Sequence, residues 1–233
     1  CSIQTELDSF FQILHHTDAP IRILTKAAFT KARAKFRYQA FVELNQHLIQ
    51  YFESHFPLRT WHGLRLLAID GTTLTLPKND DTLEHFDDLP TISHHKRPMA
   101  RASQLYDLLN RITLHASLDA YRVDERDLAL SHGPYLREND LLLLDRGYPA
   151  FWLFAWILSE SAHFCARVSL ESWRVVREFH LSGRREQIVT IHSTHDSRLK
   201  CLLYGLSTSP IRVRLLRIPI PNGEDQILMT SLL

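Results

Sequence analysis

The stretches Leu66-Leu-Ala-Ile-Asp70-Gly-Thr-Thr and Leu141-Leu-Leu-Leu-Asp145-Arg-Gly-Tyr148 decide the fold and the candidate site of this chain. Each is an apolar run typical of a buried strand, and each delivers one aspartate to its end. A buried carboxylate is costly unless it is paired, and two carboxylates that meet repel each other unless a divalent cation lies between them. The two stretches therefore predict neighbouring strands whose ends hold Mg²⁺, or Mn²⁺ as its substitute, for phosphoryl-transfer chemistry on a polyanion. The alternative, that both aspartates merely cap turns, stays open at this point.

Composition gives the broad class of the protein. The 233 residues are 45% apolar and 23% charged, which is typical of a soluble globular chain. No apolar run reaches the length of a membrane span, and no secretory signal precedes the first helix. The three cysteines and 14 histidines show neither a disulfide framework nor zinc-ligand spacing, so a reducing cytoplasm is expected. Because the chain begins at Cys1 and stops at Leu233, directly after a strand-like run, we interpret it as a fragment of a longer protein.

The net charge of +1 hides a segregation along the chain. Residues 63–166, which hold both aspartates, carry 15 acidic and 10 basic side chains, whereas residues 167–217 carry 4 acidic and 10 basic ones. A basic segment beside an acidic, metal-binding centre suits an enzyme that grips a phosphate backbone. A solvated surface strip would give the same pattern, so charge alone leaves both interpretations open.

The order of predicted elements indicates an α/β fold. Residues 1–62 have helical periodicity and form an N-terminal helical module, a possible DNA-binding unit. The first part of the core, residues 63–169, is expected to contain three strands, then a helix, a strand, a helix and a strand. The expected strands are residues 64–76, 102–108, 112–118, 141–144 and 163–169; the helices are residues 124–131 and 150–160; the polar segment 78–98 is expected to be a long loop.

This order predicts a ribonuclease-H-like mixed sheet with flanking helices. The first three strands form an antiparallel meander, the later ones arrive through helical crossovers, and the first and fourth strands are neighbours, so that Asp70 and Asp145 meet. Residues 170–217 are expected to be a basic β-rich insertion. Its strands are placed at 175–177, 187–192, 199–204 and 211–218, and residues 218–233 supply a return strand to the core.

The sequence resembles DDE transposases of bacterial insertion sequences, specifically the insertion-sequence-four family. The resemblance extends over nearly the whole chain, and Asp145-Arg-Gly-Tyr148 is its most specific part, since it looks like the family's second-aspartate motif. The other matching segments are Ala28-Phe-Thr-Lys-Ala-Arg33, Ala68-Ile-Asp-Gly-Thr-Thr73, Ser103-Gln-Leu-Tyr-Asp107 and Tyr121-Arg-Val-Asp-Glu-Arg126.

By this resemblance Asp70 and Asp145 are the first two catalytic, metal-binding members of an acidic triad. The family's third member is a glutamate in a Y-x2-R-x3-E-x6-K stretch on a later helix, and this sequence lacks such a stretch. The resemblance implies Mg²⁺-dependent cleavage and strand transfer at insertion-sequence ends, double-stranded terminal-repeat and target DNA as partners, a homodimer on DNA, and a bacterial, nucleoid-associated location. Two alternatives remain: a catalytically inactive DNA-binding remnant, and a metal-dependent nuclease not linked to transposition.

Candidate DNA contacts lie in three places. Arg146 and Tyr148 follow the second aspartate, where the arginine could pair with a phosphate and the tyrosine could stack or hydrogen-bond near the scissile strand. The remaining candidates are basic side chains of the helical module and of the basic segment: Lys31, Arg33, Lys35, Arg174, Arg177, Arg184 and Arg185. Turn packing and solvated helix faces are the alternatives for these residues.

Three further residues near the motifs have expected roles. Gly71 and Gly147 would let a DNA backbone approach closely. Glu125 is expected to be a helix-start carboxylate, with an auxiliary acid near the site as the alternative.

Overall fold

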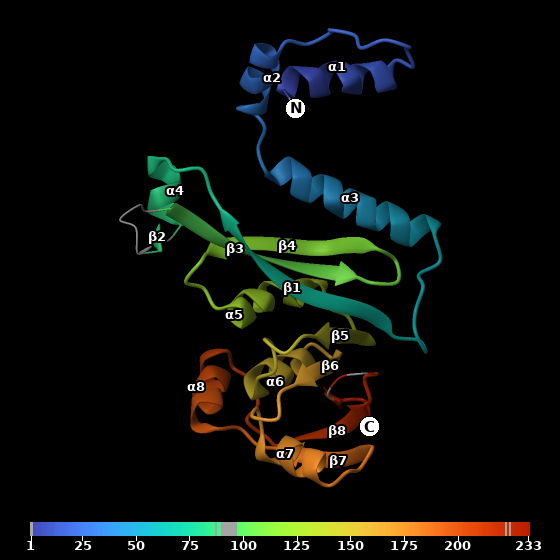
Figure 1. The fold of residues 1–233 in the computed structure, drawn as a ribbon, viewed down its shortest axis with the longest axis vertical. Coiled ribbons are helices and arrows are strands. Elements are labelled where there is room, and N and C mark those ends of the chain that lie inside the picture. The colour runs from blue at the N-terminus through green and yellow to red at the C-terminus, as the bar shows by residue number, and fades with distance from the viewer. Residues whose placement is uncertain (1, 87, 90–96, 222, 224) are drawn as a thin grey trace. The chain divides into compact units, whose positions relative to one another are not determined.

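The computed structural model describes residues 2–233 except 87, 90–96, 222 and 224. It divides into two compact units, Cys1–Ser54 and His55–Leu233 (Figure 1). The sequence places this boundary near residue 62. The earlier division arises because the segment after His55 belongs to the second unit, where the backbone of Arg59 exchanges two hydrogen bonds with the Asn110 side chain (2.9 and 3.1 Å).

The first unit is helical, as its periodicity predicts. Its helices are α1 (Ile3–Leu14), α2 (Lys26–Arg33) and α3 (Gln39–His55), whose last residue lies just beyond the division. Side chains of Ser2 and Thr25 cap the first two helices by accepting backbone N–H groups. Gln4 joins these helices, since its amide donates to Leu24 O (3.0 Å) and accepts from Lys26 N (2.7 Å).

The second unit is built on one mixed sheet. Its described strands follow the spatial order β2-β3-β1-β5-β6-β9-β8-β7, with β4 paired to β3. The strands are β1 (Arg65–Thr75), β2 (Asp88–Leu89), β3 (Arg97–Asp107), β4 (Ile112–Ala120), β5 (Asp140–Leu144), β6 (His163–Val168), β7 (Glu186–Ile191), β8 (Ile211–Ile218) and β9 (Gln226–Thr230).

The pairing confirms the predicted mixture of parallel and antiparallel strands. β1, β3 and β4 form an antiparallel meander, whereas β5 pairs parallel with β1 and β6 pairs parallel with β5. The return strand β9 runs antiparallel to β6. The strand that carries Asp70 therefore lies beside the strand that Asp145 directly follows.

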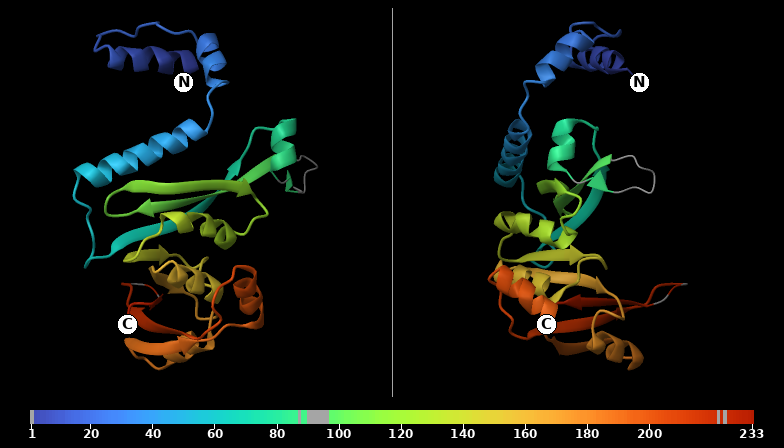
Figure 2. Two further views of the ribbon diagram at one scale, coloured as in Figure 1. Left: turned by 180° about the vertical axis from the view of Figure 1, so that it is seen from behind. Right: turned by 90° about the vertical axis from the view of Figure 1, so that its left-hand side faces the viewer.

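Helices flank this sheet. They are α4 (Asp80–His85), α5 (Glu125–Ala129) with the 3₁₀ helix η1 (Leu130–Tyr135), α6 (Phe151–Ser159), α7 (Arg174–Leu181) and α8 (His195–Leu203). Helix α6 is apolar all round, which is typical of a fully covered helix, and Phe154 stacks on Phe164 of β6 at 4.0 Å between ring centroids. Helices α6 and α8 lie side by side (Figure 2). Helix α8 also contacts α5, since Lys200 Nζ donates a hydrogen bond to Asp127 Oδ1 (2.7 Å). No helix in the described part of the chain is both long and apolar enough to cross a membrane.

Two elements of the basic segment differ from the prediction. Residues 175–177 and 199–204 lie in or at the end of helices α7 and α8, so the expectation of a β-rich insertion is wrong for these parts. In α7 the buried side chains Val176 and Phe179 are three residues apart, the helical spacing, and Arg174 pairs with Glu178 one turn later (2.7 Å). The two strands β7 and β8 extend the main sheet through β9 instead of forming a separate insertion.

The segment 78–98 is more ordered than a long loop. It contains α4, whose N-cap Asn79 forms a capping box with Thr82, and the short strand β2. Residues 87 and 90–96 of this predicted loop lie outside the described residues.

One buried ion pair joins the first strand to its parallel neighbour. Arg65 opens β1 and Asp140 opens β5, and the two are register partners. The guanidinium donates to both carboxylate oxygens, Nε to Oδ1 and NH2 to Oδ2, each at 2.7 Å. The side chains are 8% and 1% exposed, so removal of Asp140 leaves the Arg65 charge buried without this carboxylate.

We predict that Asp140→Ala lowers the free energy of unfolding by about 3–5 kcal/mol, because the Arg65 charge stays buried without its carboxylate. Urea denaturation followed by circular dichroism measures this change. The exposed neighbour Glu138 supplies the control, and Glu138→Ala is expected to change stability by less than about 0.5 kcal/mol. Equal effects of the two substitutions would contradict the structural importance of the pair.

A second buried polar group links β3, β4 and η1. His132 is fully buried; its Nε2 lies 2.9 Å from Ser103 Oγ, and its Nδ1 lies 2.8 Å from His115 Nδ1. Because two ring nitrogens face each other, only one of them carries a proton, and protonation of both rings breaks this bond. Burial, followed by the proximity of His115, lowers the pKa of His132 from 6.5 to about 4.

We predict that this histidine makes the fold sensitive to mild acid. The unfolded chain binds the proton near pH 6.5 and the folded chain only near pH 4, so stability rises with pH across this window and falls as the pH is lowered. Between these limits the wild type should lose about 3 kcal/mol more than His132→Gln in urea denaturation. The exposed His195 provides a matched histidine-to-glutamine control on the surface. A wild-type slope in His132→Gln would contradict this assignment.

Candidate metal and nucleic-acid site

The register between β1 and β5 brings the two motif aspartates together. Arg65 lies opposite Asp140 and Ala68 opposite Leu143. The same register, continued by two residues, places Asp70 opposite Asp145, which directly follows the last residue of β5. Neighbouring strands lie about 4.8 Å apart and register partners face the same side of a sheet, so the continued register predicts that the two carboxylates share one face at one level.

Both carboxylates are solvent-exposed, unlike the apolar strands that carry them. Asp70 and Asp145 are exposed, whereas Ile69 and Leu144, which precede them, are only 3% and 4% exposed. Asp70 lies inside β1, which continues to Thr75, and its Oδ1 accepts the backbone N–H of the next strand residue, Gly71 (2.9 Å). Asp145 directly follows β5, and its Oδ1 accepts the backbone N–H of Gly147 in the turn (2.8 Å). The turn-capping alternative is therefore observed for Asp145 only, and the prediction that Asp70 ends its strand is wrong, because β1 continues through its pairing with β3. A backbone N–H occupies one oxygen of each carboxylate.

The remaining oxygens determine whether a divalent cation fits. Within the described part of the chain, neither Asp70 Oδ2 nor Asp145 Oδ2 has a hydrogen-bond partner. Mg²⁺ prefers carboxylate oxygens, keeps several waters, and is commonly held by one or two carboxylates together with substrate phosphates. The pair fits such an ion in donor chemistry and donor number. Among the described residues, no group of three or more His, Cys, Asp or Glu side chains is placed to hold a metal.

Tyr148 has a different role from the predicted one. The ring is 1% exposed, so it cannot stack on a DNA base in this structure, because the residue follows the Asp145 turn into the core ahead of α6. Its hydroxyl donates to Glu125 Oε1 at 3.1 Å. Burial, followed by the nearby carboxylates of Glu125, Asp70 and Asp145, raises the pKa of the phenol, which therefore remains a donor.

Neighbouring carboxylates give each motif glycine a structural reason that does not involve DNA. A Cβ atom on Gly71 would lie 2.0 Å from Glu125 Oε1, and one on Gly147 would lie 3.2 Å from Asp145 Oδ1. Glu125 is the first residue of α5, as the sequence predicts, yet it also contacts the residue after Asp70. Its spacing in sequence gives no sign of this contact.

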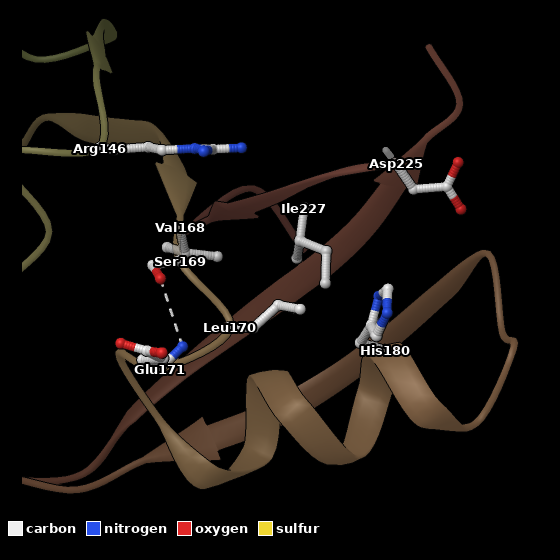
Figure 3. A pocket seen from close by; sticks show the side chains of 8 residues that line it. All are labelled: Arg146, Val168, Ser169, Leu170, Glu171, His180, Asp225 and Ile227. Carbon is white, nitrogen blue, oxygen red and sulfur yellow. Dashed lines mark hydrogen bonds between the residues drawn. The ribbon is translucent and has the colours of Figure 1, made fainter. Parts of the chain in front are cut away.

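Arg146 lines a hollow of about 420 Å³ next to the second aspartate (Figure 3). The side chain is exposed and extends over Val168 toward the far wall, which His180 and Asp225 form. Two carboxylates, Glu171 and Asp225, line the same hollow, and Asp225 is paired with Arg217 (3.1 Å). The lining of the hollow therefore has mixed charge. Arg146 supplies its exposed cation, and this residue directly follows Asp145 in the sequence.

The other predicted DNA contacts are on the surface of their units. In the first unit, Lys31 and Arg33 lie in the last turn of α2 and Lys35 follows it, all three exposed. The four arginines predicted in the basic segment of the second unit are also exposed, and they lie on α7 and in the turn before β7: Arg174, Arg177, Arg184 and Arg185.

Comparisons with known proteins give one relative by sequence. No protein-family model matches the chain. A curated protein of Escherichia coli (strain K12), "Putative transposase InsZ", is 28% identical over 132 residues. The match covers 55% of this chain and 44% of that relative, so the chain corresponds to less than half of its length.

Solved structures show weak overall likeness. A piggyBac transposase synaptic complex with hairpin DNA has a TM-score of 0.42 at 13% identity, covering 72% of this chain and 33% of that one. Endonuclease V of Ciona intestinalis, bound to an inosine-containing DNA, has a TM-score of 0.31 at 11% identity and 83% coverage of both chains. Because both TM-scores lie below 0.5, neither likeness establishes the fold or the activity of this chain.

Proposed function

We propose that this chain is part of a DNA transposase of the DDE type, related to the insertion-sequence-four family, and that Asp70 and Asp145 are its first two catalytic acids. The observation that carries the proposal is the register of β1 and β5, which aligns two exposed carboxylates with free oxygens on one face. The sequence similarity to a curated protein named as a transposase supports it. The strand arrangement β4-β3-β1-β5-β6, antiparallel and then parallel, supports a ribonuclease-H-like core.

The chemistry of the proposal follows from the two aspartates. When bound, Mg²⁺ or Mn²⁺ would supply Lewis-acid stabilisation of the oxygens that attack and leave phosphorus. Asp70 and Asp145 would hold the ion through Oδ2, while their Oδ1 atoms stay bonded to backbone N–H groups that fix both side chains. Their exposure leaves room for a phosphate of the DNA strand on the same face.

Double-stranded DNA is the proposed partner, both as element ends and as target, with the chain acting as a homodimer in the bacterial cytoplasm. The arginines of α7 and the following turn, together with Arg146, would contact phosphates in the second unit, and Lys31, Arg33 and Lys35 would do so in the first. Binding that favours terminal-repeat DNA over random duplex separates a transposase from a general metal-dependent nuclease.

A second candidate function is a DNA-binding remnant without activity. It is favoured by the lack, among the described residues, of a third acidic side chain grouped with the first two for metal binding. In that case the aspartates would serve only to accept the backbone N–H groups of Gly71 and Gly147, and the chain would bind DNA without binding Mn²⁺.

We predict that Asp70→Asn and Asp145→Asn each weaken Mn²⁺ binding by about tenfold or more, because an amide removes the charge and one hard oxygen ligand. Electron paramagnetic resonance of free Mn²⁺ in titrations of the chain measures this affinity. The exposed strand aspartate Asp119 provides the control, and Asp119→Asn should bind as the wild type does. Unchanged affinity in both variants would refute the metal site and leave the DNA-binding remnant.

The basic turn before β7 is tested separately. We predict that replacing Arg184 and Arg185 by Ala reduces the slope of log Kobs against log salt for duplex DNA by about 1–2, since each phosphate contact contributes about 0.9. Fluorescence anisotropy at several salt concentrations measures the slope. A charge-matched control, Lys78→Ala with Arg198→Ala, should leave the slope as it is. The same slope in all three proteins would exclude this turn from the DNA interface.

A further inference from the structure

The side chain of Glu125 lies between the two segments that carry the aspartates. The same atom, Oε1, accepts the hydroxyl proton of Tyr148 (3.1 Å) and occupies the space where Gly71 lacks a Cβ (2.0 Å). Gly71 directly follows Asp70, and Tyr148 ends the turn that begins at Asp145. One carboxylate oxygen thus contacts both motifs.

The hydrogen bond between Glu125 and Tyr148 is linked to Asp145 through the bonds of the turn that joins Asp145 to Tyr148. Gly147 N donates to Asp145 Oδ1 (2.8 Å), and Tyr148 N lies 3.4 Å from Asp145 O as its donor. The tyrosine ring is fixed in the core, so its hydroxyl and backbone fix the end of this turn. Loss of the Glu125 bond would leave a buried hydroxyl unpaired and loosen the turn at Asp145.

Glu125 contacts Gly71 on the face of β1 that lies opposite to the Asp70 side chain. Side chains alternate along β1, so the missing Cβ of Gly71 points to the face of Leu67 and Ile69, both buried, and opposite to Asp70. Glu125 therefore lies behind the strand that presents Asp70. This position agrees with the absence of a three-residue metal group among the described side chains, and it argues against Glu125 as a ligand.

We propose that Glu125 is a positioning residue, which braces the Asp70 strand and the Asp145 turn at the spacing a shared divalent cation requires. The inference rests on the proposed function, because it assigns Glu125 a role at that same pair of aspartates. Glu125 acts through Gly71 and Tyr148, and it touches neither metal nor substrate.

The brace is tested by Mn²⁺ titration of the 233-residue chain, with Mn²⁺ alone as the probe. We expect Glu125→Ala and Tyr148→Phe each to weaken Mn²⁺ binding by about tenfold, the usual loss when support of a ligand is removed. Glu125→Gln should restore near-wild-type affinity, because its amide oxygen still accepts from Tyr148. A strong loss in Glu125→Gln would instead indicate a charged role and overturn the brace.

Gly71→Ala provides an independent test of the contact. The added methyl group displaces the Glu125 carboxylate, so this variant should lose affinity as Glu125→Ala does. In the double variant Gly71→Ala/Glu125→Ala the displaced group is absent, and we expect no loss beyond that of Glu125→Ala alone. Additive losses would contradict the contact.

Two controls separate the possible failures. The exposed Glu138→Ala should bind Mn²⁺ as the wild type does, and circular dichroism confirms that each variant is folded at the assay temperature. Wild-type affinity in the Glu125, Tyr148 and Gly71 variants, with loss in Asp70→Asn and Asp145→Asn, would overturn the brace and leave the proposed function intact. Wild-type affinity in the aspartate variants as well would overturn both.

Discussion

The ion pair between Arg65 and Asp140 fixes the register of β1 and β5, on which the candidate site depends. Parallel strands have no connecting turn to set their register, so it must come from side chains. Here two hydrogen bonds of 2.7 Å join the first residues of β1 and β5 in a buried setting. A slip of one residue would separate these charges and would also turn Asp145 to the opposite face from Asp70. The same pair therefore penalises the wrong register and aligns the two acids.

The two faces of β1 differ in burial. Leu67 and Ile69 face the core, and Gly71 continues their row toward Glu125. Asp70 lies on the other face, exposed to water, so its charge carries no large desolvation cost. The expectation of carboxylates buried at strand tips therefore needs correction: Asp70 lies in the middle of β1, Asp145 directly follows β5, and both side chains are solvated.

Local patterns in the sequence predicted most of the core, and distant contacts account for what they missed. The leucine run before Asp145, the meander and the apolar helix α6 are each encoded within a few residues, and the structure confirms them. Helix α7 differs from the predicted strand because Val175 and Val176 have β propensity, and the helical spacing of Val176 and Phe179 extends beyond the three residues 175–177. The partners Arg65 and Asp140 are 75 residues apart, and no local pattern connects them.

Glu125 shows the same limit at the site. A glutamate at the start of a helix is explained by local structure alone, because the helix dipole stabilises a negative charge there. Its neighbours Gly71 and Tyr148 come from two other elements, and the aspartate motifs explain both of these residues without it. Only the three-dimensional structure shows that one oxygen atom accounts for both a missing Cβ and a buried hydroxyl. A glycine and a tyrosine close after an aspartate in a motif can therefore be required by a residue that supports the site, as well as by contact with its substrate.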